Sequence, residues 1–321
     1  MRGNTVRSTI CLDAALHAAL CRKAAIAHRS ISELVNDAGG PAGRRGRRMD
    51  AAPQPLALHT WTLDTTPLAR VLQVARETGW DAIELRRKDF ERAHAAGQAT
   101  EQVLDLVRAS GVRVAAMGVE AGWLFATGAE QRRLFAVFAD SCRAAVALGC
   151  ATIMSPAGPG QGTVAQAATS LRAAGDLAAA HGLRLALEFS SLGGQLDSLE
   201  RAREVLAAAD HPACGLLLDA YHLHRSGRPG RGFADVLAAE IAHVQFSDVP
   251  ATSAQPGQDR LPPGQGVAGL GEFFALLAEK GYAGYCSYEA PNPAAWARDP
   301  YAVAREALVA TRALLPRGAS A

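Results

Sequence analysis

The chain has 321 residues, of which 49% are hydrophobic and 20% are charged, a composition that suits a soluble globular protein with one large domain and a small additional unit. It contains no uninterrupted apolar stretch of about 18 residues, the length of a membrane-spanning helix, and no apolar secretion signal at its N-terminus. We therefore expect a cytoplasmic protein without a membrane partner, and six cysteines without a CxxC pair agree with reduced thiols there.

The net charge of +2 is divided unequally along the chain. Residues 1–48 contain nine Lys and Arg against three Asp and Glu, a balance of +6. The remainder must then carry −4 to give the total of +2. A basic N-terminal segment followed by a mildly acidic body indicates two units with different roles.

Residues 1–40 predict a short strand followed by two helices. Residues 6–12 alternate polar and apolar side chains, as a half-exposed strand does. Asp13 and Ser30 stand where the N-caps of two helices are expected. The segment is therefore expected to be a strand-helix-helix extension of the main domain.

This extension resembles the ribbon-helix-helix DNA-binding family, in which two chains pair their strands and outward strand residues enter the major groove. The outward residues here would be Arg7, Thr9 and Cys11. The resemblance implies that nucleic acid, if bound at all, is bound through residues 1–48. The alternatives are an extension without function and a protein that begins at Met49. Residues 41–54 predict a basic linker containing Pro and Gly.

Residues 55–318 alternate strand-like and helix-like segments. The predicted strands are residues 56–61, 82–85, 113–118, 152–155, 184–188, 215–219, 243–247 and 284–289. The predicted helices are residues 67–77, 101–109, 129–148, 163–180, 196–208, 233–239, 270–279 and 300–314. Eight strands, each followed by a helix or loop, predict an α/β fold of the (β/α)8 TIM barrel type. The alternative, an open doubly wound sheet, lacks a GxGxxG motif after its first strand.

Four predicted strands in succession end in an oxygen-bearing side chain: Glu188, Asp219, Gln245 and Glu289. The chemistry of a TIM barrel lies at the C-terminal ends of its strands, so we expect these side chains to converge. Clustered carboxylates repel one another, and a bound cation would relieve the repulsion. Oxygen donors favour one divalent ion, Mg2+ or Mn2+, with Co2+ or Zn2+ as alternatives.

Each of these residues also has a structural interpretation. Asp219 could cap the following helix, Gln245 could satisfy a buried backbone group, and a glutamate could pair with an arginine. His222 is expected at the same mouth as Asp219, or else on the surface. His243 is expected to be structural rather than a ligand.

Two further features have open alternatives. Trp61 is expected on the first strand, either as an apolar wall of the substrate site or as part of the core. The basic run Arg86, Arg87 and Lys88 is interpreted as solvated charge in preference to a binding site for an anionic substrate.

Five motifs carry a family resemblance: LALE ending at Glu188, DAYH at 219–222, HVQFSD at 243–248, RLPPGQG at 260–266 and YCSYE ending at Glu289. They resemble the xylose isomerase-like barrels, in particular the sugar phosphate isomerase/epimerase group, which includes ketose 3-epimerases, hydroxypyruvate isomerases and inosose dehydratases. The resemblance implies a divalent ion held by Glu188, Asp219, Gln245 and Glu289. Many members carry histidine where Gln245 stands, whereas hydroxypyruvate isomerase-like members carry glutamine.

The resemblance also implies that His222 and Arg260 contact the oxygens of a small polyhydroxylated substrate. Such a site can isomerise or epimerise a small sugar, sugar phosphate or hydroxy-keto acid through an enediolate, with Glu188 and Glu289 moving the proton. One alternative is a dehydratase of an inosose or dehydroshikimate type substrate, in which His222 protonates the leaving hydroxyl.

Two functions of other classes stay open. A sugar-responsive DNA-binding regulator would use residues 1–48. A DNA-repair endonuclease of the same barrel type would need more histidines near the site than this chain offers. The oligomeric state also stays open, and a homodimer is one alternative because barrels of this group often pair.

Overall fold

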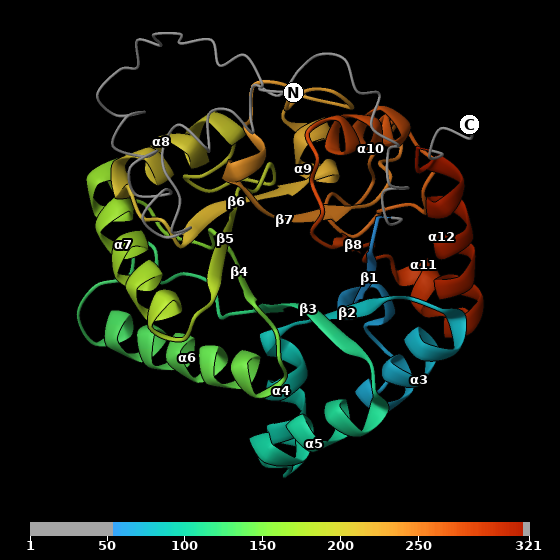
Figure 1. The fold of residues 1–321 in the computed structure, drawn as a ribbon, viewed down its shortest axis with the longest axis horizontal. Coiled ribbons are helices and arrows are strands. Elements are labelled where there is room, and N and C mark those ends of the chain that lie inside the picture. Colours follow the sequence, from blue (N-terminus) through green and yellow to red (C-terminus); the bar gives the residue numbers. More distant parts are fainter. Residues whose placement is uncertain (1–53, 317–321) are drawn as a thin grey trace, which may run out of the picture. The chain divides into compact units, whose positions relative to one another are not determined.

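Eight parallel strands form a closed barrel in the order of the sequence, and Figure 1 shows the helices arranged around them. This computed structural model describes residues 54–316. The expected strand-helix-helix extension at 1–40 lies outside the described residues, as does the linker up to residue 53. The first strand pairs with the last, with Leu56 opposite Cys286. The prediction of a (β/α)8 barrel is therefore confirmed.

The bounds of the elements agree closely with the alternation in the sequence. The strands are β1 Leu56–His59, β2 Ala82–Leu85, β3 Arg113–Gly118, β4 Thr152–Pro156, β5 Arg184–Glu188, β6 Cys214–Asp219, β7 Ile241–Phe246 and β8 Cys286–Tyr288. The helices are α3 Leu68–Thr78, α4 Arg87–Ala95, α5 Thr100–Ser110, α6 Gly128–Ala147, α7 Val164–Ala180, α8 Leu199–Ala209, α9 Ala220–Arg225, α10 Leu270–Glu279, α11 Pro293–Trp296 and α12 Pro300–Leu314. Two 3-10 turns are η1 Thr60–Leu63 and η2 Ala238–Glu240.

The helices begin and end where their capping residues dictate. At the start of α7, the Thr163 hydroxyl accepts the Gln166 N–H at 3.2 Å, and Gln166 Oε1 accepts the Thr163 N–H at 2.8 Å. This reciprocal pair satisfies two N–H groups that a helix leaves free at its N-terminus. At the other end of a helix, α3 stops at Gly79, whose φ of 88° is a left-handed conformation that glycine adopts without steric cost.

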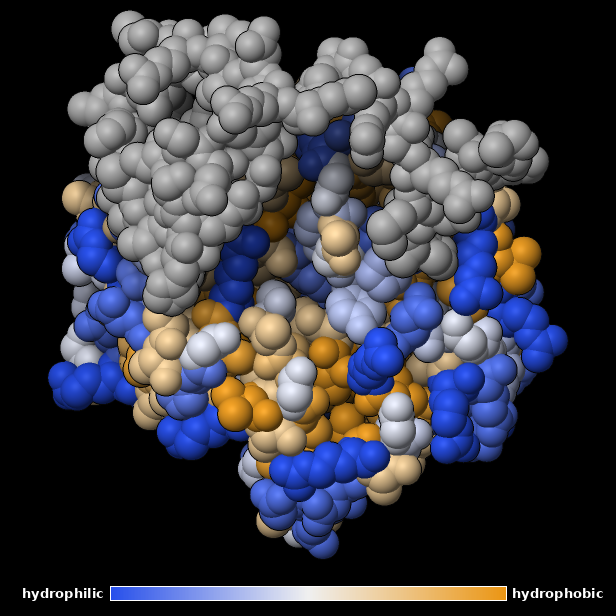
Figure 2. Space-filling view, in the orientation of Figure 1, coloured by the Kyte–Doolittle hydropathy of each residue, from blue (hydrophilic) through white to orange (hydrophobic). Residues whose placement is uncertain are grey.

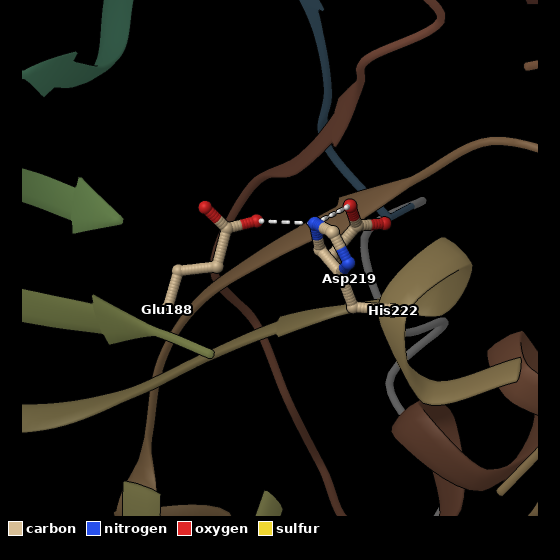
Figure 3. Close-up of side chains that lie close together, drawn as sticks. All are labelled: Glu188, Asp219 and His222. Carbon is tan, nitrogen blue, oxygen red and sulfur yellow. Dashed lines mark ion pairs between the residues drawn. The ribbon is translucent and has the colours of Figure 1, made fainter. Parts of the chain in front are cut away.

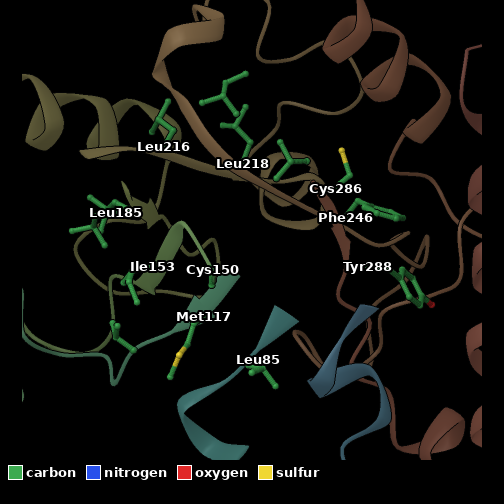
Figure 4. Close-up of a cluster of buried hydrophobic side chains, with 14 of the residues drawn as sticks. Leu85, Met117, Cys150, Ile153, Leu185, Leu216, Leu218, Phe246, Cys286 and Tyr288 are labelled. Carbon is green, nitrogen blue, oxygen red and sulfur yellow. The ribbon is translucent and has the colours of Figure 1, made fainter. Parts of the chain in front are cut away.

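The alternation of side chains along each strand separates the main core from the barrel interior. On β6, Leu216 and Leu218 belong to the large cluster between strands and helices, part of which Figure 4 shows. Leu217 belongs instead to a small cluster inside the barrel, which it shares with Ala186 of β5. Burying one such leucine contributes about 2 kcal/mol before the entropy of ordering is counted. Because Leu217 marks the inward side of β6, the side chains that alternate with it on that side are the ones that reach the mouth of the barrel.

The structure corrects the predicted helix at residues 233–239. Phe233 and Val236 are fully buried, which explains the helix-like spacing, but the segment consists of turns followed by η2. Lys280 donates through Nζ to the carbonyl oxygens of Ala234 and Val236, so these groups need no helical partners. A contact with Lys280, which directly follows α10, therefore takes the place of helical hydrogen bonds in this segment.

Two shorter differences concern the first strands. The predicted first strand continues to Trp61, whereas β1 ends at His59 and Trp61 lies in η1. The basic run after β2 begins helix α4, which was not predicted because most of its residues are charged and only Asp89 and Phe90 are buried.

The face of the molecule seen in Figure 2 carries hydrophilic side chains along its rim, with hydrophobic ones between them. Ion pairs such as those of Arg133 on α6 with Glu120 and Glu130 lie on the surface, where solvent screening leaves them little weight in stability. Among residues 54–316, no helix combines the length and apolarity needed to cross a lipid bilayer.

Candidate metal centre and active site

The four predicted ligands lie at the same end of the barrel. Glu188 and Asp219 are the last residues of β5 and β6, Gln245 is the fifth residue of β7, and Glu289 directly follows β8. Asp219 pairs in register with Gln245, which pairs in turn with Ser287 two residues before Glu289. All four side chains are buried. We call the group of Glu188, Asp219, Gln245 and Glu289 the cage.

Glu188, Asp219 and His222 offer ligand atoms that all lie within 4.8 Å of one another. Figure 3 shows the side chains of Glu188 and His222 pointing toward each other, with Asp219 beside His222. Nε2 of His222 is 3.6 Å from Oε1 of Glu188 and 3.9 Å from Oδ2 of Asp219. His222 stands on α9, three residues after Asp219, and is only 4% exposed. The alternative of a surface histidine is therefore wrong.

The two oxygens of Asp219 have different partners. Oδ1 accepts the backbone N–H of Tyr221 at 2.9 Å and caps α9, as the structural interpretation of this residue required. Oδ2 accepts from Nη1 of Arg260 at 2.7 Å and also faces His222. Asp219 is thus a helix cap and a member of the cage at once.

Arg260 reaches the cage from the long loop after β7. Its Nη1 lies 2.7 Å from Asp219 and 2.9 Å from Oε2 of Glu289, and the residue is 2% exposed. Its guanidinium also stacks over the ring of Tyr221, 4.3 Å from the centroid. The expectation that Arg260 faces the substrate is compatible with this position, and its role in substrate binding stays a prediction.

The loop that carries Arg260 is held by the first residues after β7. Asp248 accepts the backbone N–H groups of Gly264 at 2.8 Å and Ala268 at 2.9 Å. Tyr221 accepts the N–H of Gly257 through its hydroxyl at 2.6 Å. The loop is therefore fixed on both sides of Arg260, which places the guanidinium with little freedom.

The charges of the cage are unbalanced. Burial, together with the carboxylates of Glu289 and Asp219, raises the pKa of Glu188 well above its ordinary value. Burial alone would lower the pKa of Arg260, but the same carboxylates raise it, so this residue stays charged. Three carboxylates against one guanidinium leave a formal charge of −2 when all are ionised. A divalent cation would neutralise it.

His222 is a neutral donor toward the cage. Burial lowers its pKa to about 4, although Asp219 acts in the opposite direction. Its Nδ1 accepts the backbone N–H of Ser191 at 3.2 Å, so in the neutral ring the proton is assigned to Nε2, which faces Glu188. The backbone of the loop after β5 thereby sets which nitrogen of His222 donates to a ligand in the cage.

Sequence reasoning missed two residues beneath the cage. Glu84, on β2, is fully buried, and His59, at the end of β1, is 2% exposed. Burial would raise the pKa of Glu84, but His243 and His59 beside it lower the pKa to about 2. Nε2 of His243 lies 2.9 Å from Oε2 of Glu84, which agrees with the expected structural role of that histidine. Both missed residues stand at inward strand positions, which is the pattern that would have found them.

Gln245 is held by Glu84 at one end of its amide. Its Nε2 donates to Oε1 of Glu84 at 2.8 Å, so it satisfies a buried side chain and not the backbone group of the structural interpretation. Its Oε1 is buried and has no hydrogen-bond partner among the described residues. A buried amide oxygen that accepts no hydrogen bond is costly, and a cation bound to its lone pair would take the place of a donor. The donor set of the cage therefore fits a divalent metal ion.

Trp61 and the basic run lie beside the mouth. Trp61 is half-buried, and the guanidinium of Arg86 stands 5.8 Å from its ring centroid. Arg86 is paired with Asp64 at 2.6 Å, and exposed Lys88 is paired with a residue of its own helix, so neither is free for an anion. Nε of Arg87 is buried and has no partner among residues 54–316. The apolar-wall role of Trp61 stays a prediction.

A cavity of about 600 Å³ lies elsewhere, at the N-terminal end of the strands. It opens between α8 and the start of β6 and is lined in part by Glu200, Arg203, Cys214 and Glu240. Cys214 is the first residue of β6, whereas Asp219 in the cage is the last. The cavity is therefore separate from the cage, which lies at the opposite end of the barrel.

Residues 72–312 match the family described as xylose isomerase-like TIM barrel. The chain is 35% identical over 136 residues to 3-dehydroshikimate dehydratase of Pseudomonas aeruginosa, a match covering 41% of this chain and 21% of that protein. The chain thus spans about a fifth of the length of that relative. It is 22% identical over 246 residues to inosose isomerase of Halalkalibacterium halodurans, covering 72% of this chain and 86% of that protein.

Among solved structures, that of the IolI protein with a bound zinc atom has a TM-score of 0.73 to this chain at 19% identity. The similarity covers 81% of this chain and 98% of the other, and at this identity it supports the fold alone. The family match, by contrast, covers well over half of the 321 residues. On that match, the chain belongs to the xylose isomerase-like TIM barrel family.

Proposed function

We propose that this protein is a divalent-metal-dependent isomerase or epimerase of a small sugar, sugar phosphate or hydroxy-keto acid. The observation that carries the proposal is the position of two buried glutamates, Glu188 and Glu289, at either end of the row of strands that also bears Asp219 and Gln245. Two carboxylates on different sides of a bound substrate can serve two faces or two neighbouring carbon atoms.

The cage would hold the metal ion through Glu188, Asp219, Gln245 and Glu289. Four oxygen donors favour Mg2+ or Mn2+, and Co2+ or Zn2+ are alternatives. When bound, such an ion polarises a substrate carbonyl and makes the neighbouring C–H more acidic. A zinc atom is bound in the IolI structure, a protein of the same fold, and this agrees with a metal in the cage without identifying it.

The protein's own groups then move the proton. One of Glu188 and Glu289 removes it from the carbon beside the carbonyl, and the other returns it to the enediolate of the substrate. Return to the other face of the same carbon gives epimerisation, and return to the adjacent carbon gives isomerisation.

Two further residues would orient the substrate. His222 presents its Nε2 proton beside Glu188 and would donate it in a hydrogen bond to a substrate hydroxyl or carbonyl oxygen. Arg260 stays charged between Asp219 and Glu289 and would contact a second oxygen. Together they favour a ligand with several adjacent oxygens, as a small polyhydroxylated compound has.

A second candidate is a dehydratase acting on an inosose or dehydroshikimate type substrate. It is favoured by the neutral His222 beside Glu188, since its Nε2–H would donate a hydrogen bond to the leaving hydroxyl, while the glutamate that has taken up the substrate proton returns it to that hydroxyl, which leaves as water. The 35% identity to a 3-dehydroshikimate dehydratase over part of the chain supports the same chemistry. A sugar-responsive DNA-binding regulator is a third candidate, but it depends on residues 1–48, outside the described residues.

The test is deuterium exchange by the purified full chain supplied with Mn2+ or Mg2+. Ketoses, hydroxypyruvate and inososes are incubated in D2O, and incorporation is followed by mass spectrometry. Glu289→Gln should lower exchange about 10²- to 10⁴-fold while leaving the fold intact, because it removes a proton-transfer group. Glu130→Gln, on the exposed surface of α6, is the matched control.

The outcomes separate the candidates. Deuterium exchange without a new ultraviolet absorption band supports the isomerase or epimerase. An ultraviolet band from an unsaturated product supports the dehydratase. Exchange retained in both Glu188→Gln and Glu289→Gln would remove the two-glutamate mechanism altogether.

A further inference from the structure

Gln245 can bind a cation in only one rotation of its amide, unlike the carboxylates of the cage. A carboxylate offers an oxygen at either end, whereas an amide has an oxygen at one end and an NH2 group at the other. Only the oxygen can bind a cation, and a rotated amide would direct two N–H donors at the same place. A cage with glutamine as one member therefore needs something that fixes the rotation of this side chain.

The structure places such a group directly behind Gln245. Oε1 of Glu84 lies 2.8 Å from Nε2 of Gln245, and both residues are fully buried. A carboxylate has acceptors only, so the amide must turn its NH2 group toward Glu84. Oε1 of Gln245 is left without a partner among the described residues.

Glu84 is itself held in position across the barrel. Its other oxygen, Oε2, lies 2.9 Å from Nε2 of His243, which stands two residues before Gln245 on the inward face of β7. β2 and β7 are not neighbours in the ring of strands, so the contact spans the interior. Glu84 is therefore fixed by one residue of β7 and fixes another.

We propose that Glu84 is a positioning residue that orients the Gln245 amide so that its carbonyl oxygen serves as a metal ligand. The inference rests on the proposed function, because it presupposes that the cage binds a divalent ion. Glu84 does not touch the substrate or the ion; it acts through Gln245. Residues that orient the ligands of a metal typically change its affinity about 10- to 100-fold when replaced.

The experiment measures the Kd of Mn2+ for the full chain by titration calorimetry, without any substrate. Glu84→Asp keeps the negative charge but withdraws the carboxylate by one methylene, so the amide loses its partner. We expect its Kd to rise about 10- to 100-fold, similar to the rise in Gln245→Ala. If charge alone mattered, Glu84→Asp would bind Mn2+ as the unaltered chain does, and the inference would be wrong.

A reciprocal exchange tests the same point by rescue. Glu84→Gln alone should weaken Mn2+ binding, since an amide can accept from or donate to Gln245 and no longer dictates its rotation. Combined with Gln245→Glu, it restores one amide and one carboxylate, now with an oxygen facing the cage in either rotation. We expect the double variant to regain most of the affinity, and a double variant as weak as Glu84→Gln would overturn the proposal.

Thermal unfolding of each variant without metal checks that the fold is intact, and the rescue pair decides the matter should Glu84→Asp fail to fold. The two levels of the argument fail differently. If Mn2+ affinity is unchanged in Gln245→Ala and Asp219→Ala, the proposed metal site is wrong. If those variants lose affinity but the Glu84 variants do not, only the role of Glu84 is wrong.

Discussion

Nε2 of His59 lies 3.3 Å from Oε1 of Glu289, across the seam where β1 meets β8. Nδ1 of His59 accepts the backbone N–H of Trp61 at 3.1 Å, so the ring proton is assigned to Nε2, toward Glu289. Arg260 contacts the other oxygen of the same carboxylate. Glu289 is thus held from both sides, as Glu188 is faced by His222.

This relationship predicts that His59→Phe keeps the packing volume but lowers kcat about 10- to 100-fold, because Glu289 loses one of the donors that orient it. Steady-state kinetics on the substrate found by deuterium exchange would measure the effect. His94→Phe, an exposed histidine on α4, is the control and should leave kcat unchanged. Equal kcat in both variants would mean that His59 does not orient Glu289.

Arg260→Met should affect metal binding and the use of the substrate in opposite directions. The loss of a positive charge between Asp219 and Glu289 removes repulsion toward a cation, so Mn2+ should bind more tightly and raise the Tm by a larger amount. The value of kcat/KM should fall about 100-fold, because a group that positions the substrate is gone.

The control for this variant is Arg225→Met. Arg225 also stands over the Tyr221 ring, at 5.6 Å, but it is exposed and has no contact with the cage. It should change neither Mn2+ affinity nor kcat/KM. Weaker Mn2+ binding in Arg260→Met would show that the guanidinium supports the cage more than it competes with a cation.

Asp64, near the mouth of the barrel, should make the free energy of unfolding depend on pH. Burial alone would raise its pKa, but hydrogen bonds from Arg92 and Arg86 lower it below the ordinary value of 3.8. A carboxyl with a lowered pKa in the folded state stabilises the fold above its ordinary pKa and loses that contribution as the pH falls through the lowered value.

Asp64→Asn should therefore reduce the free energy of unfolding by about 1–2 kcal/mol at neutral pH, with the difference shrinking in increasingly acidic solution. Urea unfolding over a series of pH values measures this. Asp140→Asn, an exposed residue paired on the surface of α6, should show little difference at any pH. A constant difference down to the acid end of the series would contradict the role of the charge.

The thiols of the barrel should resist alkylation in the folded protein. Burial raises the pKa of Cys142 and Cys150 to about 11 and also raises the pKa of Cys286. At pH 8 the thiolate fraction of the first two would be about one in a thousand, and access is closed as well. Peptide mapping after iodoacetamide should find these three unmodified until the chain is unfolded in urea, and rapid native labelling would contradict their burial.

Much of the cage was predictable because it follows from two general rules. Strand alternation sets which side chains face inward, and the C-terminal ends of barrel strands set where they meet. Glu188, Asp219, Gln245 and Glu289 satisfy both rules in consecutive strands, so a scan of the last four strands was enough. The capping role of Asp219 was also predictable from the helix that follows it.

Glu84 escaped because its partners are far away in the sequence. The separations to His243 and Gln245 are 159 and 161 residues, and no local pattern links positions so distant. Glu84 was nevertheless visible as the single charge in the otherwise apolar strand β2. Applying the same alternation rule to β1 and β2 would have identified both His59 and Glu84 as candidate site residues. The absent helix at 233–239 has the same origin, since Lys280, directly after α10, donates to the carbonyl groups of Ala234 and Val236.

The pairing of β1 with β8 joins the earliest and latest strands of the barrel, and His59 and Glu289 lie on either side of that seam. On the proposed mechanism, a fragment that lacks either strand loses the contact between His59 and Glu289, however well its remaining strands associate. Separately produced halves of the barrel should be inert alone and become active only when mixed. The proposed activity accordingly requires the closed ring of strands, and the presence of the site residues alone is not sufficient for it.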